Sequence, residues 1–403
     1  MLVVVIDRHY LGDGRINRHL DYISKIYPTI RINFSPSNNG IRECLLSNNI
    51  SCYCQPVSSS SSANHNTFAQ YLVFAGYVPK GVKSFVLSHL ESTQDIILHV
   101  HDPALLTISV HLKKWLFKIG KNVRLVYDRH EFYEKYEIKH WYPTPTNHTF
   151  EKVFGSFVDG VIGISHETEV SLKYLFSHAC IASVPNYIDF QKIDGASTLE
   201  KINSILSGGV LRCVYFGTLN MASREIDLIS WLSDNLLTNY SNVEVVIGGN
   251  TNDGALLSTF SSLSLKHPNR FKYLGYVPYE QLIEETQKAA IGFLFIRETG
   301  GSYWVSDGSP NKLYEYLNCG VIPVMRIPHI DIEYLKPEVV LCNSNESWDE
   351  ILVRVQSLIE SPRNILKTHI ESLLEKSVPY RFSHVAPNYL RIYQQVFEKK
   401  KVN

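Results

Sequence analysis

The sequence predicts an α/β protein with two doubly wound, mostly parallel sheets. Short β-branched runs alternate with amphipathic segments, and this alternation starts a second time near residue 209. The length agrees, because 403 residues at about 150 per domain correspond to two or three domains. Hydrophobic residues make up 44% and charged residues 19%, a globular composition that excludes a disordered chain.

The first series of elements contains four expected buried strands, each a short run rich in β-branched residues. They are 2–6, 95–100, 123–127 and 160–164. Helices are expected between them. Ile16, Leu20 and Ile23 fall at i, i+4 and i+7 on one helix face, and the segment 112–119 repeats this pattern.

The second series contains five expected strands, several of them followed by turn glycines. They are 211–216, 243–247, 271–274, 291–295 and 321–324. The boundaries predicted from these patterns are a first domain at 1–185, a linker at 186–208 and a second domain at 209–379. The last helix, about 380–400, has Pro387 in its first turn and is expected to cross back to the first domain.

Charge and cysteine content exclude several classes of protein. Lys plus Arg and Asp plus Glu both number 39, so a dedicated nucleic-acid binder with a basic excess is not expected. No run of about 18 apolar residues occurs, and seven scattered cysteines fit a reducing compartment, so a cytoplasmic protein is expected. Cys52 and Cys54 lack the spacing and the following pair of a zinc knuckle, so no metal is expected.

The richest polar segment, 306–320, begins as a loop and continues as a short helix. Ser309 suits the N-cap and Pro310 the first helical position. Free N–H groups and Lys312 in the first turn favour a bound phosphate. Asp307 and Glu315 would each bind sugar hydroxyls, which suits one ligand with a phosphate between two sugars. The alternative is a capped surface helix with an ordinary salt bridge.

This segment resembles the nucleotide-sugar motif of GT-B glycosyltransferases, especially glycosyltransferase family 4. The resemblance rests on 309–324, which begins Ser309, Pro310, Asn311, Lys312 and ends in a Gly-hydrophobic-Pro-Val pattern. It implies two facing Rossmann-like domains with an interdomain cleft and a C-terminal crossover helix. It also implies that Glu315 holds the donor ribose, while Asp307, in place of the usual Glu, contacts the donor sugar.

Two further turns of the second domain agree with the resemblance. Gly217 lies in a glycine turn that the family places at the donor diphosphate. Thr218 replaces the usual Arg there, so Arg224 and Lys312 are expected to supply the positive charge. The second turn contains Gly275, Tyr276 and Val277, and the resemblance implies that the backbone of this turn faces the nucleotide base.

In the first domain, the resemblance singles out two strand ends. Gly14 and Arg15 open the helix after the first strand, where the family has a loop beside the donor phosphates. His130 follows a later strand, where a family histidine contacts the reacting sugar. Asp102 and Glu131 are candidates for orienting the acceptor or a loop. The ordinary alternative for His130 is a structural role.

The implied function is transfer of a sugar from a nucleotide-sugar donor to a glycan or lipid-linked acceptor, with retention of anomeric configuration and without a metal or cofactor. Surface polysaccharide or glycolipid synthesis is the expected setting. Two other classes stay open: another GT-B enzyme, such as a nucleotide-sugar epimerase or an inverting transferase, and a degenerate homologue that only binds a glycan or partner.

The basic stretch 111–121 has two interpretations. Its apolar residues can pack on the sheet, with the lysines in water. Alternatively, its lysines and aromatic residues contact an anionic membrane, which would place the protein at the inner membrane face.

Overall fold

The computed structural model describes residues 1–35, 43–46, 49–54, 76–90, 95–130, 147–166, 168–189, 195–297, 310–327 and 335–399. The chain forms two compact units. The first comprises Met1–Pro185 and Val385–Asn403, and the second comprises Asn186–His384. The sequence placed the end of the second domain at 379, five residues before this boundary. Among the described residues, none of the helices is long and apolar enough to cross a bilayer.

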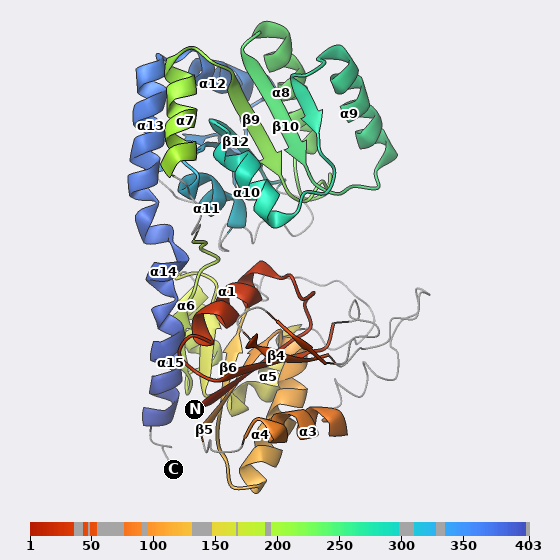
Figure 1. Cartoon of the computed structure of the whole chain (residues 1–403), viewed down its shortest axis with the longest axis vertical. Helices are drawn as coiled ribbons and strands as arrows, with labels where there is room; N and C mark the ends of the chain where they lie inside the picture. The colour runs from red at the N-terminus through yellow and green to blue at the C-terminus, as the bar shows by residue number, and fades with distance from the viewer. Residues whose placement is uncertain are drawn as a thin grey trace. The chain divides into compact units, whose positions relative to one another are not determined.

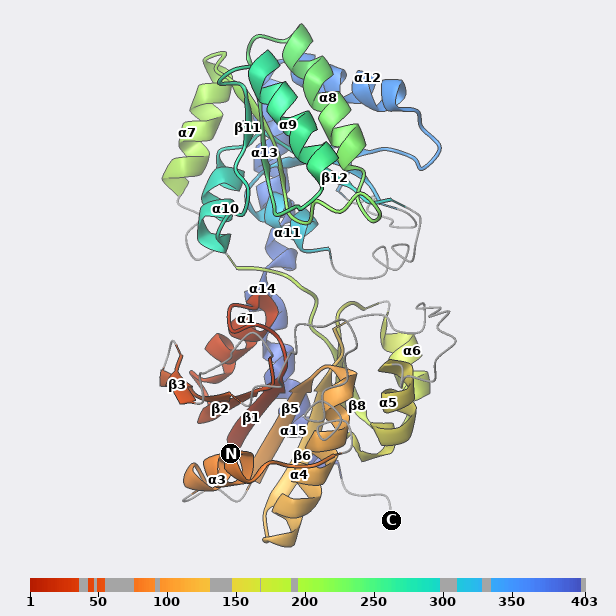
Figure 2. The ribbon, with the colours of Figure 1, turned by 90° about the vertical axis from the view of Figure 1, so that its right-hand side faces the viewer.

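The described residues of the first unit contain an eight-stranded sheet in the order β3-β4-β2-β1-β5-β6-β7-β8 (Figure 2). Neighbouring strands are parallel, except for the antiparallel pair β3 and β4. The strands are β1 Leu2–Asp7, β2 Thr29–Asn33, β3 Glu43–Leu45, β4 Ser51–Cys54, β5 Asp95–His101, β6 Asn122–Asp128, β7 Gly160–Gly163 and β8 Cys180–Ser183. The strand order reverses between β1 and β5, the kind of position at which open sheets bind ligands.

Helices cover both faces of this sheet, with α4 in front of it and α15 behind it in Figure 2. Ile16, Leu20 and Ile23 are buried as their spacing predicts. Asp13 caps α1 by accepting hydrogen bonds from two backbone N–H groups. The helices are α1 Gly14–Ile23, α3 Lys80–Ser88, α4 Leu106–Lys118, α5 Asn147–Phe154, α6 Thr168–Leu175 and α15 Pro387–Glu398. The short helix α14, Phe382–Val385, contains the sequence boundary between the two units.

The C-terminal helix α15 packs on the first unit through two buried tyrosines, Tyr389 and Tyr393. The Tyr393 hydroxyl lies 2.8 Å from His19 Nε2 and 2.7 Å from His99 Nδ1. Gly160 at the start of β7 allows close contact, since a methyl group there would lie 2.9 Å from Val396. The last helix therefore completes the core that the first 185 residues begin.

The described residues of the second unit contain a six-stranded sheet in the order β11-β10-β9-β12-β13-β14, with parallel neighbours throughout. The strands are β9 Leu211–Phe216, β10 Val243–Gly248, β11 Phe271–Tyr273, β12 Ile291–Phe295, β13 Ile322–Arg326 and β14 Val340–Leu341. The helices are α7 Gly195–Leu206, α8 Ile226–Asn239, α9 Gly254–Lys266, α10 Tyr279–Gln287, α11 Asn311–Asn318, α12 Trp348–Glu360 and α13 Arg363–Lys376 (Figure 1). This sheet reverses its strand order between β9 and β12.

The interpretation of 186–208 as a linker is wrong for residues 195–206, which form α7. This helix is part of the second unit, because the buried Lys201 Nζ donates to the carbonyl oxygens of Cys319 at 2.7 Å and Gly320 at 3.0 Å. α7 also packs against α13. A signal for this helix was present in the sequence, because Leu199, Ile202 and Leu206 fall at i, i+3 and i+7 and Ile202 is buried.

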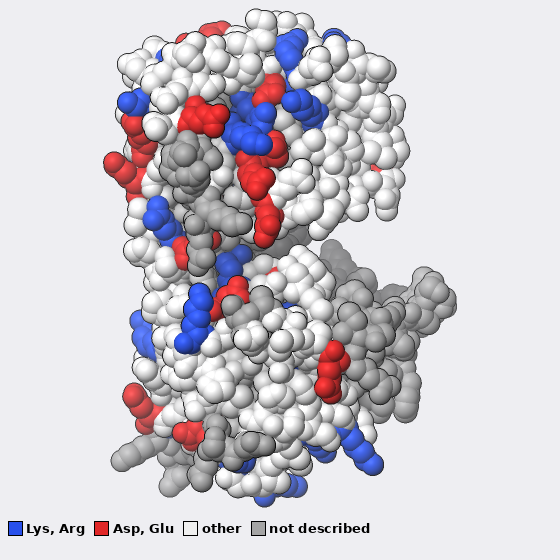
Figure 3. All heavy atoms as spheres, in the orientation of Figure 1, with Lys and Arg blue, Asp and Glu red and all other residues white. Residues whose placement is uncertain are grey.

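Surface charge is mixed, as the net charge of zero suggests. On the face shown in Figure 3, the described Lys and Arg side chains alternate with Asp and Glu side chains over each unit. That face shows no continuous basic stripe among the residues described.

Changing Tyr393→Phe should destabilise the first unit. The substitution keeps the ring but leaves two buried imidazole nitrogens without their hydroxyl partner, which costs about 1–3 kcal/mol. Urea unfolding of the full chain should show this loss. Tyr174→Phe, at a side chain that is 87% exposed, is the matched control and should leave the unfolding free energy unchanged. Equal unfolding free energies of the two variants would show that the contacts of the Tyr393 hydroxyl with His19 and His99 do not stabilise the first unit.

Candidate functional sites at the strand ends

Three glycine turns meet at the carboxyl edge of the second unit's sheet. The Gly217 N–H donates to the Gly248 carbonyl at 2.9 Å, and the Gly249 N–H donates to the Gly275 carbonyl at 2.7 Å. A methyl group on Gly249 would lie 2.0 Å from the Gly217 carbonyl oxygen, so no larger residue fits there. The turns that follow β9, β10 and β11 are thereby held together by their backbones.

Lys312, in the first turn of α11, lies against the first of these turns. A methyl group on Gly217, whose φ is +147°, would lie 2.4 Å from Lys312 Nζ, so the glycine makes room for the ammonium group. The Nζ atom also lies 5.4 Å from the centre of the Tyr215 ring. Burial lowers the pKa of Lys312, the charge of Glu315 opposes this shift, and the charge of Arg224 adds to it.

Arg224 and Glu315 thus both lie close enough to Lys312 to act on it electrostatically. Glu315 lies one helical turn after Lys312 and is buried. Arg224 is half-buried and donates from Nη1 to the Ser223 carbonyl at 2.8 Å. The carboxylate of the neighbouring residue, Glu225, lies 3.3 Å from Arg326.

The turn predicted to face the base adjoins this cluster. Val277 is buried, and its Cγ2 would lie 2.9 Å from a methyl group on Gly248. Tyr276 is 73% exposed, and Gly275 adopts a φ of +64° that favours glycine. The turn therefore has one buried residue, Val277, and one exposed side chain, Tyr276.

The start of α11 differs by one residue from the prediction. The helix begins at Asn311, and Pro310 occupies the N-cap position rather than the first turn. Proline has no side-chain acceptor for the first N–H groups, so Pro310 leaves them to other partners. Asp307, Ser309 and Glu131 lie outside the described residues.

In the first unit, the corresponding strand ends are joined by a buried carboxylate, Asp128. Its Oδ1 lies 2.7 Å from Arg15 Nη2, and its Oδ2 lies 3.4 Å from both His99 Nε2 and the Tyr389 hydroxyl. Although burial opposes it, the charge of Arg15 holds the pKa of Asp128 well below its usual range. Elements α1, β5, β6 and α15 all contribute to this cluster.

Arg15 was expected to reach a phosphate, but in the structure its guanidinium binds groups of the protein itself. Its guanidinium is buried and donates to Asp128 and, at 2.8 Å, to the Val184 carbonyl. Gly14, beside it, is the first residue of α1. The arrangement gives Arg15 a positioning role for the strand end that carries His130.

His130 lies at the rim of this cluster. Its Nε2 is 2.7 Å from His101 Nδ1, and its ring centre is 5.0 Å from that of His9. Burial lowers the pKa of His130 to about 4, so the imidazole is neutral at pH 7 and offers one donor and one acceptor. A neutral ring can hydrogen-bond a sugar hydroxyl without adding charge.

A second carboxylate, Asp102, was predicted, but its partner His9 was not. His9 Nε2 lies 3.0 Å from Asp102 Oδ2. Although burial opposes it, the hydrogen bond from His9 lowers the pKa of Asp102 to about 2. Asp102 has a φ of +81°, a strained conformation that non-glycine residues often adopt at functional sites. The Asp7-Arg8-His9 run after the first strand was the sequence signal for His9.

The histidine cluster predicts acid sensitivity. Burial lowers the pKa of His19, His99, His101 and His130, the last to about 4, from an ordinary value of 6.5. Between these values the unfolded chain binds more protons than the folded chain, so the free energy of unfolding should fall as the pH falls from about 6.5 to about 4. Urea unfolding across this window measures the slope.

His130→Gln should reduce that slope, whereas His384→Gln, at an exposed histidine, should preserve it. A wild-type unfolding free energy that is constant across the window would refute a neutral, buried cluster.

Comparison with known proteins identifies the fold of the chain. No family model and no curated protein matches the sequence. Solved structures similar to the whole chain include one titled trehalose-6-phosphate from E. coli bound with UDP-2-fluoro glucose (13% identity, TM-score 0.64, covering 98% of this chain and 99% of that one).

Two others are a UDP-forming α,α-trehalose-phosphate synthase from Burkholderia xenovorans (12%, TM-score 0.66, covering 98% and 99%) and a sucrose-phosphate synthase from Thermosynechococcus elongatus (12%, TM-score 0.63, covering 99% of each). At this identity the likeness concerns the fold. The two α/β units, with the last helix returned to the first, are therefore those of the GT-B fold, as the sequence predicted.

Proposed function

We propose that the protein is a glycosyltransferase that moves a sugar from a nucleotide-sugar donor to an acceptor, with retention of anomeric configuration. One observation carries the proposal: the Lys312 ammonium group lies on the Gly217 turn, close to Arg224 and Glu315 and at the start of α11. Two cations, a helix N-terminus and a carboxylate are the groups that a nucleoside diphosphate sugar requires.

The donor roles follow from chemistry and position. Lys312 and Arg224 bind the diphosphate, and the Glu315 carboxylate accepts hydrogen bonds from the ribose hydroxyls. The base lies on the turn Gly275–Val277, and the phosphates lie on the segment that includes Ser309, Pro310 and Asn311. Asp307 contacts the donor sugar. The similar structure that contains UDP-2-fluoro glucose makes UDP the first nucleotide to test.

In the proposed reaction, the bond between the anomeric carbon and the diphosphate oxygen breaks, and the acceptor oxygen bonds to that carbon from the same face. The departing diphosphate takes the acceptor proton, so no charge is left unbalanced. Negative charge grows on the leaving oxygen, where the preorganised Lys312 and Arg224 stabilise it. His130, on the first unit, hydrogen-bonds the transferred sugar.

The acceptor that we propose is a glycan or lipid-linked sugar, as in surface polysaccharide or glycolipid synthesis. The similar structures are named for synthases of trehalose phosphate and sucrose phosphate, which supports a sugar acceptor but not its lipid link. Analysis of the product by NMR would give the anomeric configuration, and a retained α-linkage from an α-linked donor is expected.

Nucleotide binding should depend on Lys312 and Glu315. A ligand at ten times its Kd stabilises the folded state by about 1.4 kcal/mol. In a thermal-shift panel of UDP, GDP, ADP and CMP, at least one nucleotide should raise the Tm of the wild type, and Lys312→Met and Glu315→Ala should abolish the rise. Glu371→Ala, at a half-exposed glutamate of α13, should retain it.

Two results would contradict the donor site: no nucleotide shifts the Tm, or the shift persists in both variants. Binding without transfer or donor hydrolysis would instead indicate a degenerate homologue. Turnover of the donor sugar to an epimer without an acceptor would indicate an epimerase.

We also propose that the basic stretch 111–121 contacts an anionic membrane, at the cytoplasmic face. Leu112 and Leu116 of α4 are buried in the core, as the ordinary interpretation predicts. Phe117, however, is 67% exposed, and Lys114 and Lys118 beside it are exposed. Exposed lysines next to an exposed aromatic ring suit a surface of acidic lipid.

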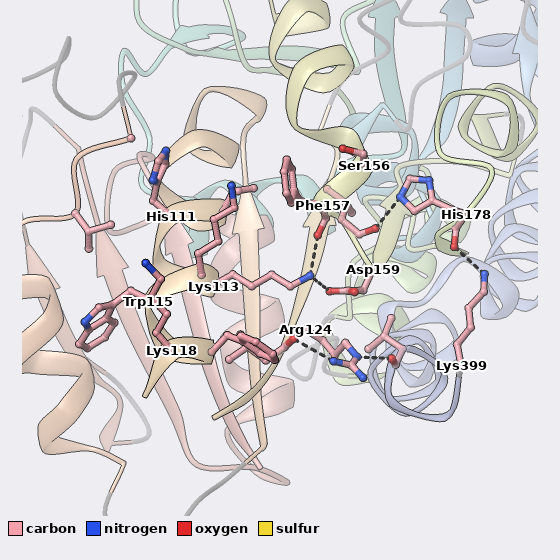
Figure 4. Close-up of a pocket in the computed structure, with 18 of the residues that line it drawn as sticks. His111, Lys113, Trp115, Lys118, Arg124, Ser156, Phe157, Asp159, His178 and Lys399 are labelled. Atoms are coloured by element: carbon pink, nitrogen blue, oxygen red, sulfur yellow. Dashed lines mark hydrogen bonds and ion pairs between the residues drawn. The ribbon is translucent and has the colours of Figure 1, made fainter. Parts of the chain in front are cut away.

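Lys114, Phe117 and Lys118 line a cavity of about 1290 Å³ at the amino edge of the first unit's sheet. Figure 4 shows Lys113 directed toward Asp159 and the Phe157 carbonyl, and both contacts are hydrogen bonds. Lys113 is therefore occupied, whereas the Lys114 ammonium lies over the Phe157 ring at 4.4 Å. Lys114 and Lys118 are the cations best placed for lipid.

Flotation with phosphatidylcholine vesicles, with and without phosphatidylglycerol, tests this contact. Lys114→Glu combined with Lys118→Glu should lower binding to the acidic vesicles more than about tenfold, since each cation near such a surface contributes about 1 kcal/mol. Lys25→Glu combined with Lys173→Glu changes the charge equally at exposed positions outside the cavity and should have little effect. Equal losses in both double variants would show only a net-charge effect.

A further inference from the structure

Three cysteines lie close together on the edge hairpin β3–β4 of the first unit. In the strand order, β4 is three strands away from β5, which carries His99 and His101. Cys44 lies on β3, and Cys52 and Cys54 lie on β4. The antiparallel register places Cys44 directly opposite Cys52. Cys52 and Cys54 are two residues apart, so both side chains leave β4 on the same face.

The sulfur atoms are spaced as metal ligands are. The three Sγ atoms lie within 4.8 Å of one another, and those of Cys52 and Cys54 are 3.9 Å apart. A metal–sulfur bond of about 2.3 Å puts two ligating sulfurs about 3.8 Å apart in tetrahedral and about 4.0 Å apart in trigonal geometry. The observed pair falls between these two values.

Disulfide formation does not account for the cluster, because all three cysteines are free and a disulfide would hold the sulfurs about 2.05 Å apart. Core packing alone gives no reason for three sulfurs to meet, since any small apolar side chain fills a buried strand position equally well. Cys52 and Cys54 are buried, while Cys44 is half-buried and gives the cluster one accessible member.

We propose that Cys44, Cys52 and Cys54 bind one thiophilic metal ion, Cu(I) or Zn(II). Soft thiolate ligands select these ions over hard cations such as Mg²⁺. Each thiol loses its proton to solvent on binding, so three protons are released for each ion bound. The resulting anionic centre would lie next to Arg31, which stands opposite Cys52 on β2, acts on it electrostatically and is itself paired with Asp7 at 2.7 Å.

Such a centre would attach the short edge strand to the rest of the sheet. β3 has three residues and pairs with β4 alone among the described strands. Cys44 is the only one of the three ligands on β3, so the ion would join the two strands of the hairpin through their side chains. The inference does not depend on the proposed transferase activity.

Metal content tests the proposal directly. The reduced full-length protein is incubated with Zn(II), or with Cu(I) under anaerobic conditions, in the presence of a competing chelator. It is then desalted and analysed by mass spectrometry of the metal. The wild type should retain one ion per chain. Cys44→Ser and Cys52→Ser should each bind more than about tenfold more weakly, because the loss of even an outer-shell partner costs about 10–100-fold.

Cys180→Ser removes a half-buried cysteine outside the cluster and should leave the stoichiometry at one. If Cys52→Ser does not fold, Cys44→Ser alone tests metal binding, because a half-buried position tolerates the polar substitution better than a buried one. Failure of the wild type to retain either ion, or equal retention by the Cys44→Ser and wild-type chains, would overturn the proposal.

Discussion

The first unit depends on one buried charge, the Asp128 carboxylate. A carboxylate without water is stable only when donors surround it, and here donors come from α1, β5 and α15. Arg15 neutralises it, and His99 and Tyr389 occupy the other oxygen. Because α15 is among the last elements of the chain, this carboxylate joins the C-terminus to the first strands. It also fixes β6 at the point from which His130 projects.

In the second unit, the corresponding constraint is steric. Gly217 and Gly249 approach so closely that a single methyl group would displace backbone, and the space left at Gly217 is occupied by the Lys312 ammonium group. The position of the ammonium group therefore depends on the glycine, because a side chain at position 217 would occupy the space of Lys312 Nζ. The second unit can therefore hold a cation at this turn, although the chain's net charge of zero gives no sign of anion binding.

The fold could be predicted from the sequence because buried parallel strands are short β-branched runs, which local pattern identifies. The docking of α7 could not be predicted, since it depends on Lys201 donating to carbonyls more than a hundred residues away. Arg15 is a second case, because its partner Asp128 lies 113 residues on. Lys312 and Gly217 are also far apart in the sequence, and only the resemblance to a known motif linked them. Cys44 was also missed, because only the strand register places it opposite Cys52.

Arg15 and Lys312 show how two cations at strand ends acquire different uses. Arg15 is buried against a carboxylate, so its charge is already compensated and holds structure. The pKa of Lys312 is lowered by burial, with Arg224 acting in the same direction and only Glu315 opposing. An anion bound at the Gly217 turn would stabilise the buried positive charge of Lys312. This gain in free energy would add to the affinity of the protein for the anion. A cation that is costly in the free protein is therefore the better candidate for a diphosphate than a cation already paired.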